Sequence, residues 1–123
     1  MATFPALTPN LRSLDLGNYP QVVHVAVSGI NLRFLQGSKR INQILTLGYS
    51  NITETDLQLI YTHYETQEGT LVPFDLPAAV WAGYASVPIS AVDYNWRYAS
   101  TIAVDTASPL RYNVNVQLVS VVL

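Results

Sequence analysis

The final third of the chain contains a strict alternation of apolar and polar residues. In residues 110–118, large apolar side chains fall on one face of an extended chain and polar side chains on the other. The apolar set is Leu110, Tyr112, Val114, Val116 and Leu118, and the polar set is Arg111, Asn113, Asn115 and Gln117. A period of two is the repeat of a β-strand with one buried face. The alternation therefore predicts a mainly β fold, with this strand against the core.

Further strands are predicted before and after the centre of the chain. Residues 21–28 and 32–36 flank Gly29, a residue that can adopt positive φ, and are predicted to form a hairpin. The other predicted strands cover residues 40–49, 70–76 and 94–104, and residues 77–93 are predicted to form a long loop or an irregular hairpin. The apolar residues 119–123 extend the last strand, which we expect to pair internally or with another subunit.

One helix is predicted over residues 54–67. Thr53 and Asp56 stand at the two positions of a capping box, and Gly69 is placed to end the helix. Apolar and aromatic residues then recur at helical spacing on one face, which is the predicted core face of the helix. These residues are Leu57, Ile60, Tyr61 and Tyr64.

Residues 1–20 form no clear periodic pattern. They contain Pro5, Pro9 and Pro20, and are predicted to form an extended N-terminal arm that hangs free or lies along a neighbour. Residues 21–123 are then a single β-rich domain, because 123 residues are too few for two full cores.

Charged residues make up only 11% of the chain, whereas about 25% is usual for soluble domains. Its surface must instead be built from uncharged polar residues and its eight tyrosines, and tyrosine is enriched at protein interfaces. This composition favours a subunit of a larger assembly over a small neutral β domain that stays monomeric. The net charge of −2 argues against a nucleic-acid-binding role. We expect neither a signal peptide nor a transmembrane helix.

The sequence offers little for catalysis. It has no cysteine, and its two histidines, His24 and His63, lack the spacing of metal ligands. Glu65 and Glu68 could share a helix face, but both are expected in solvent. No recognised catalytic or phosphate-binding motif is present. A small enzyme would need converging polar groups, so we expect no enzymatic activity, no metal and no cofactor.

Aromatic residues cluster in the second half of the chain. The candidate interface aromatics are Trp81, Tyr84, Trp96 and Tyr98. Core and interface packing is one interpretation of these residues. The alternative is that these four residues and Tyr94 form a stacking platform for a sugar ring, which would make the protein a carbohydrate-binding or receptor-contacting accessory.

Several short strings follow one another in an order that is similar to a known protein family. They are Gly29-Ile30-Asn31-Leu32-Arg33-Phe34-Leu35-Gln36-Gly37, Ile44-Leu45-Thr46-Leu47-Gly48-Tyr49, Asn51-Ile52-Thr53-Glu54-Thr55-Asp56, Glu68-Gly69-Thr70, Pro73-Phe74-Asp75-Leu76-Pro77 and Asn95-Trp96-Arg97-Tyr98. Over residues 20–123, this order resembles small bacteriophage minor tail proteins. These include the minor tail protein M group, which acts as a distal tail ring, and similar proteins of cyanobacterial phages. Residues 77–93 and the N-terminal arm do not match the family pattern.

The resemblance implies a tail-tube-like fold, with antiparallel sheets in a β-sandwich or small barrel and one flanking α-helix. It implies a structural protein of the virion, assembled in the host cytoplasm, whose copies form a homo-oligomeric ring such as a hexamer. The ring would join the tail tube to the hub or tip proteins. DNA would pass through its channel without specific binding, and no membrane would be involved.

Overall fold

The computed structural model describes residues 3–19, 21–25, 27, 29, 31–35 and 39–122, and describes only the backbone of residues 21–25 and 31–35. The elements in chain order are β1 (Leu11–Asp15), β2 (Gln21–Val25), β3 (Asn31–Leu35), β4 (Ile44–Thr53), α1 (Glu54–Thr66), the 3-10 helix η1 (Ala78–Trp81), β5 (Tyr94–Tyr98), β6 (Ala103–Ser108) and β7 (Arg111–Val122).

Strand β7, with 12 residues, is the central strand of the main sheet. One side of β7 pairs with β4, which pairs in turn with β1. The other side pairs with β6 over its first half and with β5 over its second half, and every pairing is antiparallel. The described sheet is therefore open, with β1 at one edge and β5 and β6 at the other.

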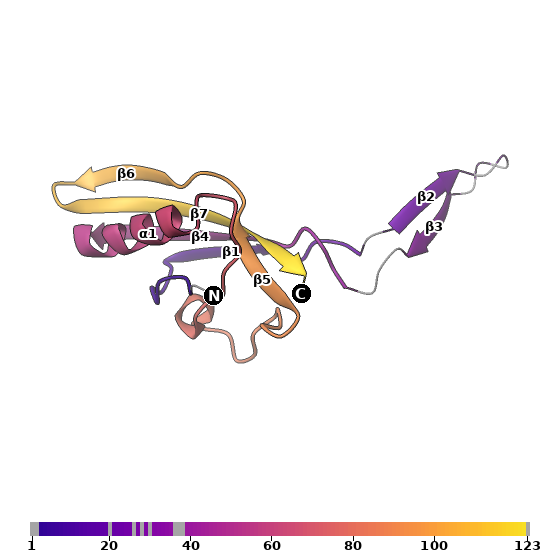
Figure 1. Cartoon of the computed structure of the whole chain (residues 1–123), viewed down its shortest axis with the longest axis horizontal. Helices are drawn as coiled ribbons and strands as arrows, with labels where there is room; N and C mark the ends of the chain where they lie inside the picture. The colour runs from indigo at the N-terminus through magenta and orange to yellow at the C-terminus, as the bar shows by residue number, and fades with distance from the viewer. Residues whose placement is uncertain are drawn as a thin grey trace.

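The predicted hairpin around Gly29 is confirmed. Strands β2 and β3 pair antiparallel as a separate two-stranded sheet, and Gly29 has a φ of 85°. Figure 1 shows this hairpin projecting from one end of the body, well away from α1 and the main sheet.

The prediction of a mainly β fold with one α-helix is confirmed. The finer prediction of a sandwich or barrel is not confirmed, because the main sheet does not close and the β2–β3 sheet does not cover it (Figure 1).

One face of the main sheet carries the core. The predicted apolar face of β7 is confirmed for Val114, Val116 and Leu118, which are buried, while Leu110 is exposed in the turn before the strand. On β4, Leu45, Leu47 and Tyr49 are buried on the same side. The other buried apolar residues are Phe4, Leu57, Ile60, Phe74, Val80, Trp81, Ile89, Tyr94, Trp96 and Tyr98.

Helix α1 begins and ends close to its predicted bounds. The side chain of Thr53 caps it by accepting a hydrogen bond from the Asp56 backbone N–H at 3.4 Å. The chain leaves the helix at Gln67 and then Gly69, whose φ is 67°. The acidic residues Glu54 and Asp56 lie in the first turn, where the helix dipole favours negative charge.

The prediction of an N-terminal arm over residues 1–20 is wrong for the described part of that segment. Strand β1 belongs to the main sheet, and Phe4 is only 1% exposed. The backbone N–H of Phe4 donates to the carbonyl of Asp75 at 2.8 Å, which holds the segment against the core. The boundary at residue 20 therefore does not separate an arm from a domain.

Two strand predictions also need correction. Residues 70–76 form no strand; only Phe74 and Asp75 make isolated bridges, in a segment bounded by Pro73 and Pro77. The single strand predicted over 94–104 is divided into β5 and β6, because both segments pair with successive parts of β7.

Candidate functional site

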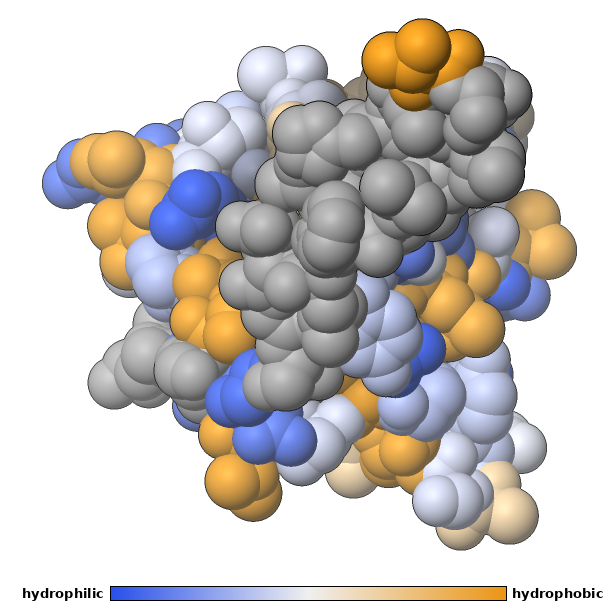
Figure 2. Space-filling model, turned by 90° about the vertical axis from the view of Figure 1, so that its right-hand side faces the viewer, coloured by the Kyte–Doolittle hydropathy of each residue, from blue (hydrophilic) through white to orange (hydrophobic). Residues whose placement is uncertain are grey.

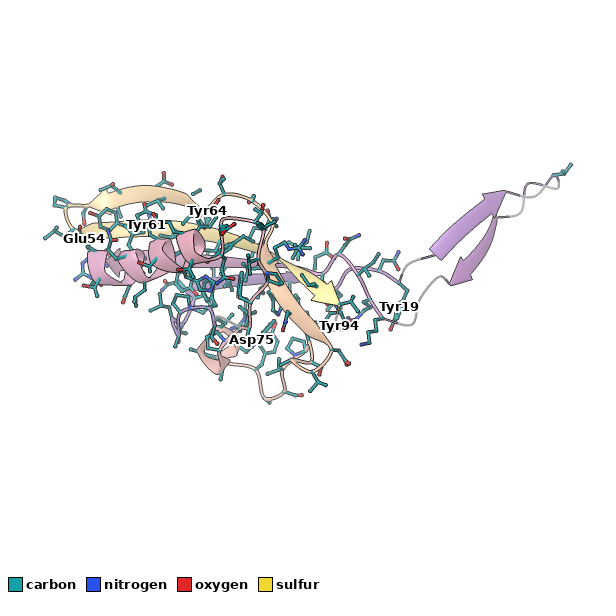
Figure 3. The ribbon with its side chains drawn as sticks, in the orientation of Figure 1. Tyr19, Glu54, Tyr61, Tyr64, Asp75 and Tyr94 are labelled. Carbon is teal, nitrogen blue, oxygen red and sulfur yellow. The ribbon has the colours of Figure 1, made fainter. Side chains whose placement is uncertain are left out.

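A partly open cavity of about 210 Å³ lies between η1, the loop that precedes β5, and β5 itself. Its aromatic walls come from Trp81, Tyr94 and Trp96, and its polar residues are Asp75 and Ser90. Figure 3 shows Asp75 and Tyr94, the first residue of β5, in the lower part of the body, on the side where η1 lies. The remaining lining residues are Leu76, Ala78, Val87, Ile89 and Ala91. This mainly apolar cavity is the candidate binding site.

Backbone pairing fixes the aromatic walls. Phe74 and Trp96 exchange two backbone hydrogen bonds, of 2.7 and 2.9 Å, so that the segment before η1 runs beside β5. The rings of Trp81 and Trp96 have their centroids 6.2 Å apart in a tilted arrangement. Trp81 and Trp96 are 7% and 4% exposed, so little of either ring faces solvent.

Arg12 fastens β1 to the end of η1. Its Nη1 donates to the backbone carbonyls of Val80 at 2.7 Å and Ala82 at 2.9 Å. The guanidinium carbon also lies 4.5 Å from the centroid of the Tyr84 ring, a cation–π geometry. A side chain far away in the sequence thus positions the helical segment that carries Trp81.

A second polar feature lies inside the core, beneath α1. Nδ1 of His63 and the hydroxyl of Tyr98 are 2.7 Å apart. Edge-to-face contacts with Phe4 and Phe74 surround the imidazole, at centroid distances of 5.5 and 4.6 Å. His63 is 8% exposed, so a ligand in solvent has little access to it.

Burial determines the protonation of this pair. Loss of solvation lowers the pKa of His63 to about 4, so the imidazole is neutral at pH 7. Burial, and to a lesser degree the neighbouring Tyr49 and Tyr64, raises the pKa of Tyr98. The Tyr98 hydroxyl therefore stays protonated and shares one hydrogen bond with Nδ1 of the neutral imidazole, whose tautomer decides which group donates. Nε2 of His63 is buried and has no hydrogen-bond partner among the described residues.

The predicted core face of α1 is only partly the buried face. Leu57 and Ile60 are buried, and Tyr61 and Tyr64 are half-buried at its margin (Figure 3). His63 and Gln67, which the sequence analysis did not assign to the core, are 8% and 2% exposed. Buried positions thus recur at Leu57, Ile60, His63 and Gln67, with helical steps of three, three and four.

The predicted interface aromatics do not form one exposed platform. Trp81 and Trp96 line the cavity, Tyr98 is buried against His63, and only Tyr84 is substantially exposed, at 43%. Of the two histidines, His63 is in the core, and the side chain of His24 lies outside the described residues.

These features define a small α+β domain with an open antiparallel sheet and an apolar cavity beside its edge strand β5. No family model, curated protein or solved structure matches the chain. The described residues contain no group of three or more histidine, aspartate or glutamate side chains able to hold a metal ion. Nor do they include a helix that is both long and apolar enough to cross a membrane.

Proposed function

We propose that this chain is a structural subunit of a bacteriophage tail. Its copies would form a ring at the distal end that joins the tail tube to the hub. The role is geometric: neighbouring copies join edge to edge and enclose a channel. The proposal combines the order of sequence strings described above with one structural observation, the open sheet.

The sheet offers an edge suited to pairing between copies. Strand β6 pairs only with β7 among the described strands, and five of its six residues are exposed. Monomeric proteins usually protect such an edge with lysine, proline or a bulge. Strand β6 has a register shift near its end, but its only charge is Asp105. Strand β1 provides a second edge on the opposite side of the sheet, as a repeating contact requires.

The surface supports an assembly of modest, distributed contacts. Exposed apolar side chains include Leu11, Val92 and Leu110. Figure 2 shows that, on the face seen from the hairpin end, apolar side chains reach the surface at several separate places. Charge depletion and scattered apolar groups fit a surface that is covered by several neighbours.

In this proposal, the tail-tube-like barrel would be formed by the whole ring of subunits and not by a single chain. Edge pairing between β1 of one copy and β6 of the next would continue the sheet from subunit to subunit. Closure would then occur around the whole ring, and no single chain would need to close its own sheet.

Sedimentation velocity over a concentration series, followed by electron microscopy of the largest species, tests the proposal. We expect a closed oligomer of defined mass with a central channel, formed by the protein alone or with the adjoining tail protein. A monomer at every concentration, with and without that partner, would contradict it.

A second candidate function is carbohydrate or receptor contact at the cavity. The observation in its favour is the aromatic lining with Asp75 and Ser90 as polar groups. Against it, 210 Å³ is below the range of about 300–1,000 Å³ usual for ligand pockets. Titration with galactose, followed by tryptophan fluorescence, tests this alternative. A saturable change that Trp96→Phe weakens would support it.

A further inference from the structure

The turn between β6 and β7 contains a leucine in an unfavourable backbone conformation. This turn consists of Pro109 and Leu110, and Leu110 has a φ of 62°. Positive φ at the second central residue after a proline is normally adopted by glycine or asparagine. Among the described non-glycine residues with positive φ, Leu110 is the only apolar one; the others are Asn42, Asn51 and Glu68.

Neither the turn nor the core explains this leucine. The residue is 69% exposed, so most of its surface is not used in packing within its own chain. A β-branched or bulky residue at positive φ is a conformational outlier, and such strain is concentrated at functional positions. Packing within the monomer does not account for a leucine at this position, and an exposed apolar group fits a contact with another molecule.

The same chain contains a cavity that can receive it. The cavity at Trp81 and Trp96 has a volume of about 210 Å³, and an apolar cavity of about 150 Å³ already holds a benzene molecule. A leucine side chain has four carbon atoms and benzene has six, so the cavity is large enough for a leucine side chain. Figure 1 shows the β6–β7 turn at the end of the body opposite the β2–β3 hairpin, away from η1, so the two features are apart within one copy.

The charges beside the two features are complementary. Arg111, which follows Leu110, is exposed and positive, whereas Asp75 in the cavity lining is exposed and negative. A second copy of this chain can therefore match both the apolar and the ionic part of the contact.

We propose that Leu110 of one copy inserts into the Trp81–Trp96 cavity of the next copy, with Arg111 placed toward Asp75. This inference rests on the proposed function and adds a side-chain contact to the proposed edge pairing between its subunits. The two partner surfaces differ, so the contact is heterologous and can repeat around a ring.

Substitution of Leu110 distinguishes the effect of its backbone strain from the effect of its proposed contact with the next copy. Asparagine tolerates positive φ, so Leu110→Asn should raise the Tm of the monomer by a few degrees or leave it unchanged. The same change should raise the dissociation constant of the oligomer at least about tenfold, because an apolar side chain is lost from the contact. Leu110→Met, which stays apolar, is the matched control and should retain assembly.

Mixing two defective variants tests the direction of the contact. Ala91→Arg places a bulky charge at an exposed position in the cavity lining and should block the cavity. At a protein concentration at which the wild type just assembles, Leu110→Asn and Ala91→Arg should each stay largely monomeric. Their equimolar mixture should form a 1:1 dimer, because one supplies an open cavity and the other an intact leucine. A contact between two Leu110 side chains would not be rescued in this way.

Cysteine cross-linking tests the position, since the chain has no cysteine of its own. Leu110→Cys mixed with Ala78→Cys should give a disulfide-linked dimer under mild oxidation. Leu110→Cys mixed with Gln117→Cys, an exposed position on β7, should not.

The outcomes separate the proposed Leu110 contact from the proposed ring. If the wild type assembles and Leu110→Asn assembles equally well, this inference is wrong while the proposed ring stands. If the wild type is monomeric under all conditions, the proposed function fails and the contact fails with it. Occupation of the cavity by galactose without any change in mass would overturn the contact and assign the cavity to a saccharide.

Discussion

At the scale of single residues, His63 makes the stability of the fold depend on pH. Its pKa is about 4 in the folded chain and 6.5 in the unfolded chain, so between these values the unfolded chain binds more protons. The free energy of unfolding should therefore be fully retained above pH 6.5 and fall as pH drops toward 4. The loss should amount to about 3 kcal/mol. Urea denaturation at pH values from 4 to 7.5 measures it.

The variant His63→Gln isolates this contribution. Glutamine can still form a hydrogen bond with Tyr98 but does not titrate, while His24 and all carboxylates are unchanged. The difference in unfolding free energy between wild type and variant should change with pH only in the window from 6.5 to 4. An equal pH dependence in the two proteins would mean that His63 is not the titrating group.

The burial of His63 and Gln67 could not be predicted from the pattern of apolar residues. The steps from Leu57 through Ile60 to His63 and Gln67 keep the buried face in register, but the last two residues are polar. A search for apolar periodicity instead selected Tyr61 and Tyr64, which lie at the margin. The imidazole is tolerated because Tyr98, a residue 35 positions away, supplies its hydrogen bond.

At the scale of elements, α1 is held on the sheet by a small number of apolar side chains. Leu57 and Ile60 are 4% and 0% exposed. Leu57→Ala or Ile60→Ala should each lower the free energy of unfolding by about 2–5 kcal/mol, because each leaves a cavity in the core. Leu59→Ala, at a position 49% exposed on the same helix, is the control and should change it by under about 0.5 kcal/mol. Chemical denaturation gives all three values.

The connection between β1 and η1 depends on Arg12. Arg12→Met keeps much of the side-chain length but removes both hydrogen bonds to the carbonyls of Val80 and Ala82. We expect a loss of about 1–3 kcal/mol, since hydrogen bonds from a charged donor are among the stronger ones. Limited proteolysis should also cleave faster within residues 82–92. Glu65→Met, which removes an exposed charged side chain on α1, should leave both measurements unchanged.

Local signals predicted the elements whose pattern is complete within a few residues. The caps and periodicity of α1, the alternation of β7 and the glycine of the β2–β3 turn are of this kind. The N-terminal segment was wrongly predicted because its partners are distant: Phe4 joins Asp75, and Arg12 joins Val80. The cavity was missed for the same reason, since its walls come together only when Phe74 pairs with Trp96.

At the scale of the whole molecule, the balance of charge bears on the proposed channel for DNA. The net charge of each copy is −2. Two of the six basic side chains are already engaged: Arg12 binds backbone carbonyls, and Lys39 lies 3.4 Å from a carboxylate oxygen of Asp93. Because attraction to phosphate requires clustered cations, such a surface would not hold DNA that passed through the proposed channel.

The isolated protein should therefore show no saturable binding to duplex DNA at concentrations up to about 10⁻⁴ M, the weak limit of ordinary non-specific binding. Fluorescence anisotropy of a labelled duplex at low and physiological salt measures this. The double variant Asp15→Lys with Asp105→Lys is the control, because two charge reversals change the net charge from −2 by +4 to +2. That variant should acquire weak binding that salt abolishes. Tight, salt-sensitive binding by the wild type would contradict a channel that DNA crosses freely and would indicate a DNA-contacting role.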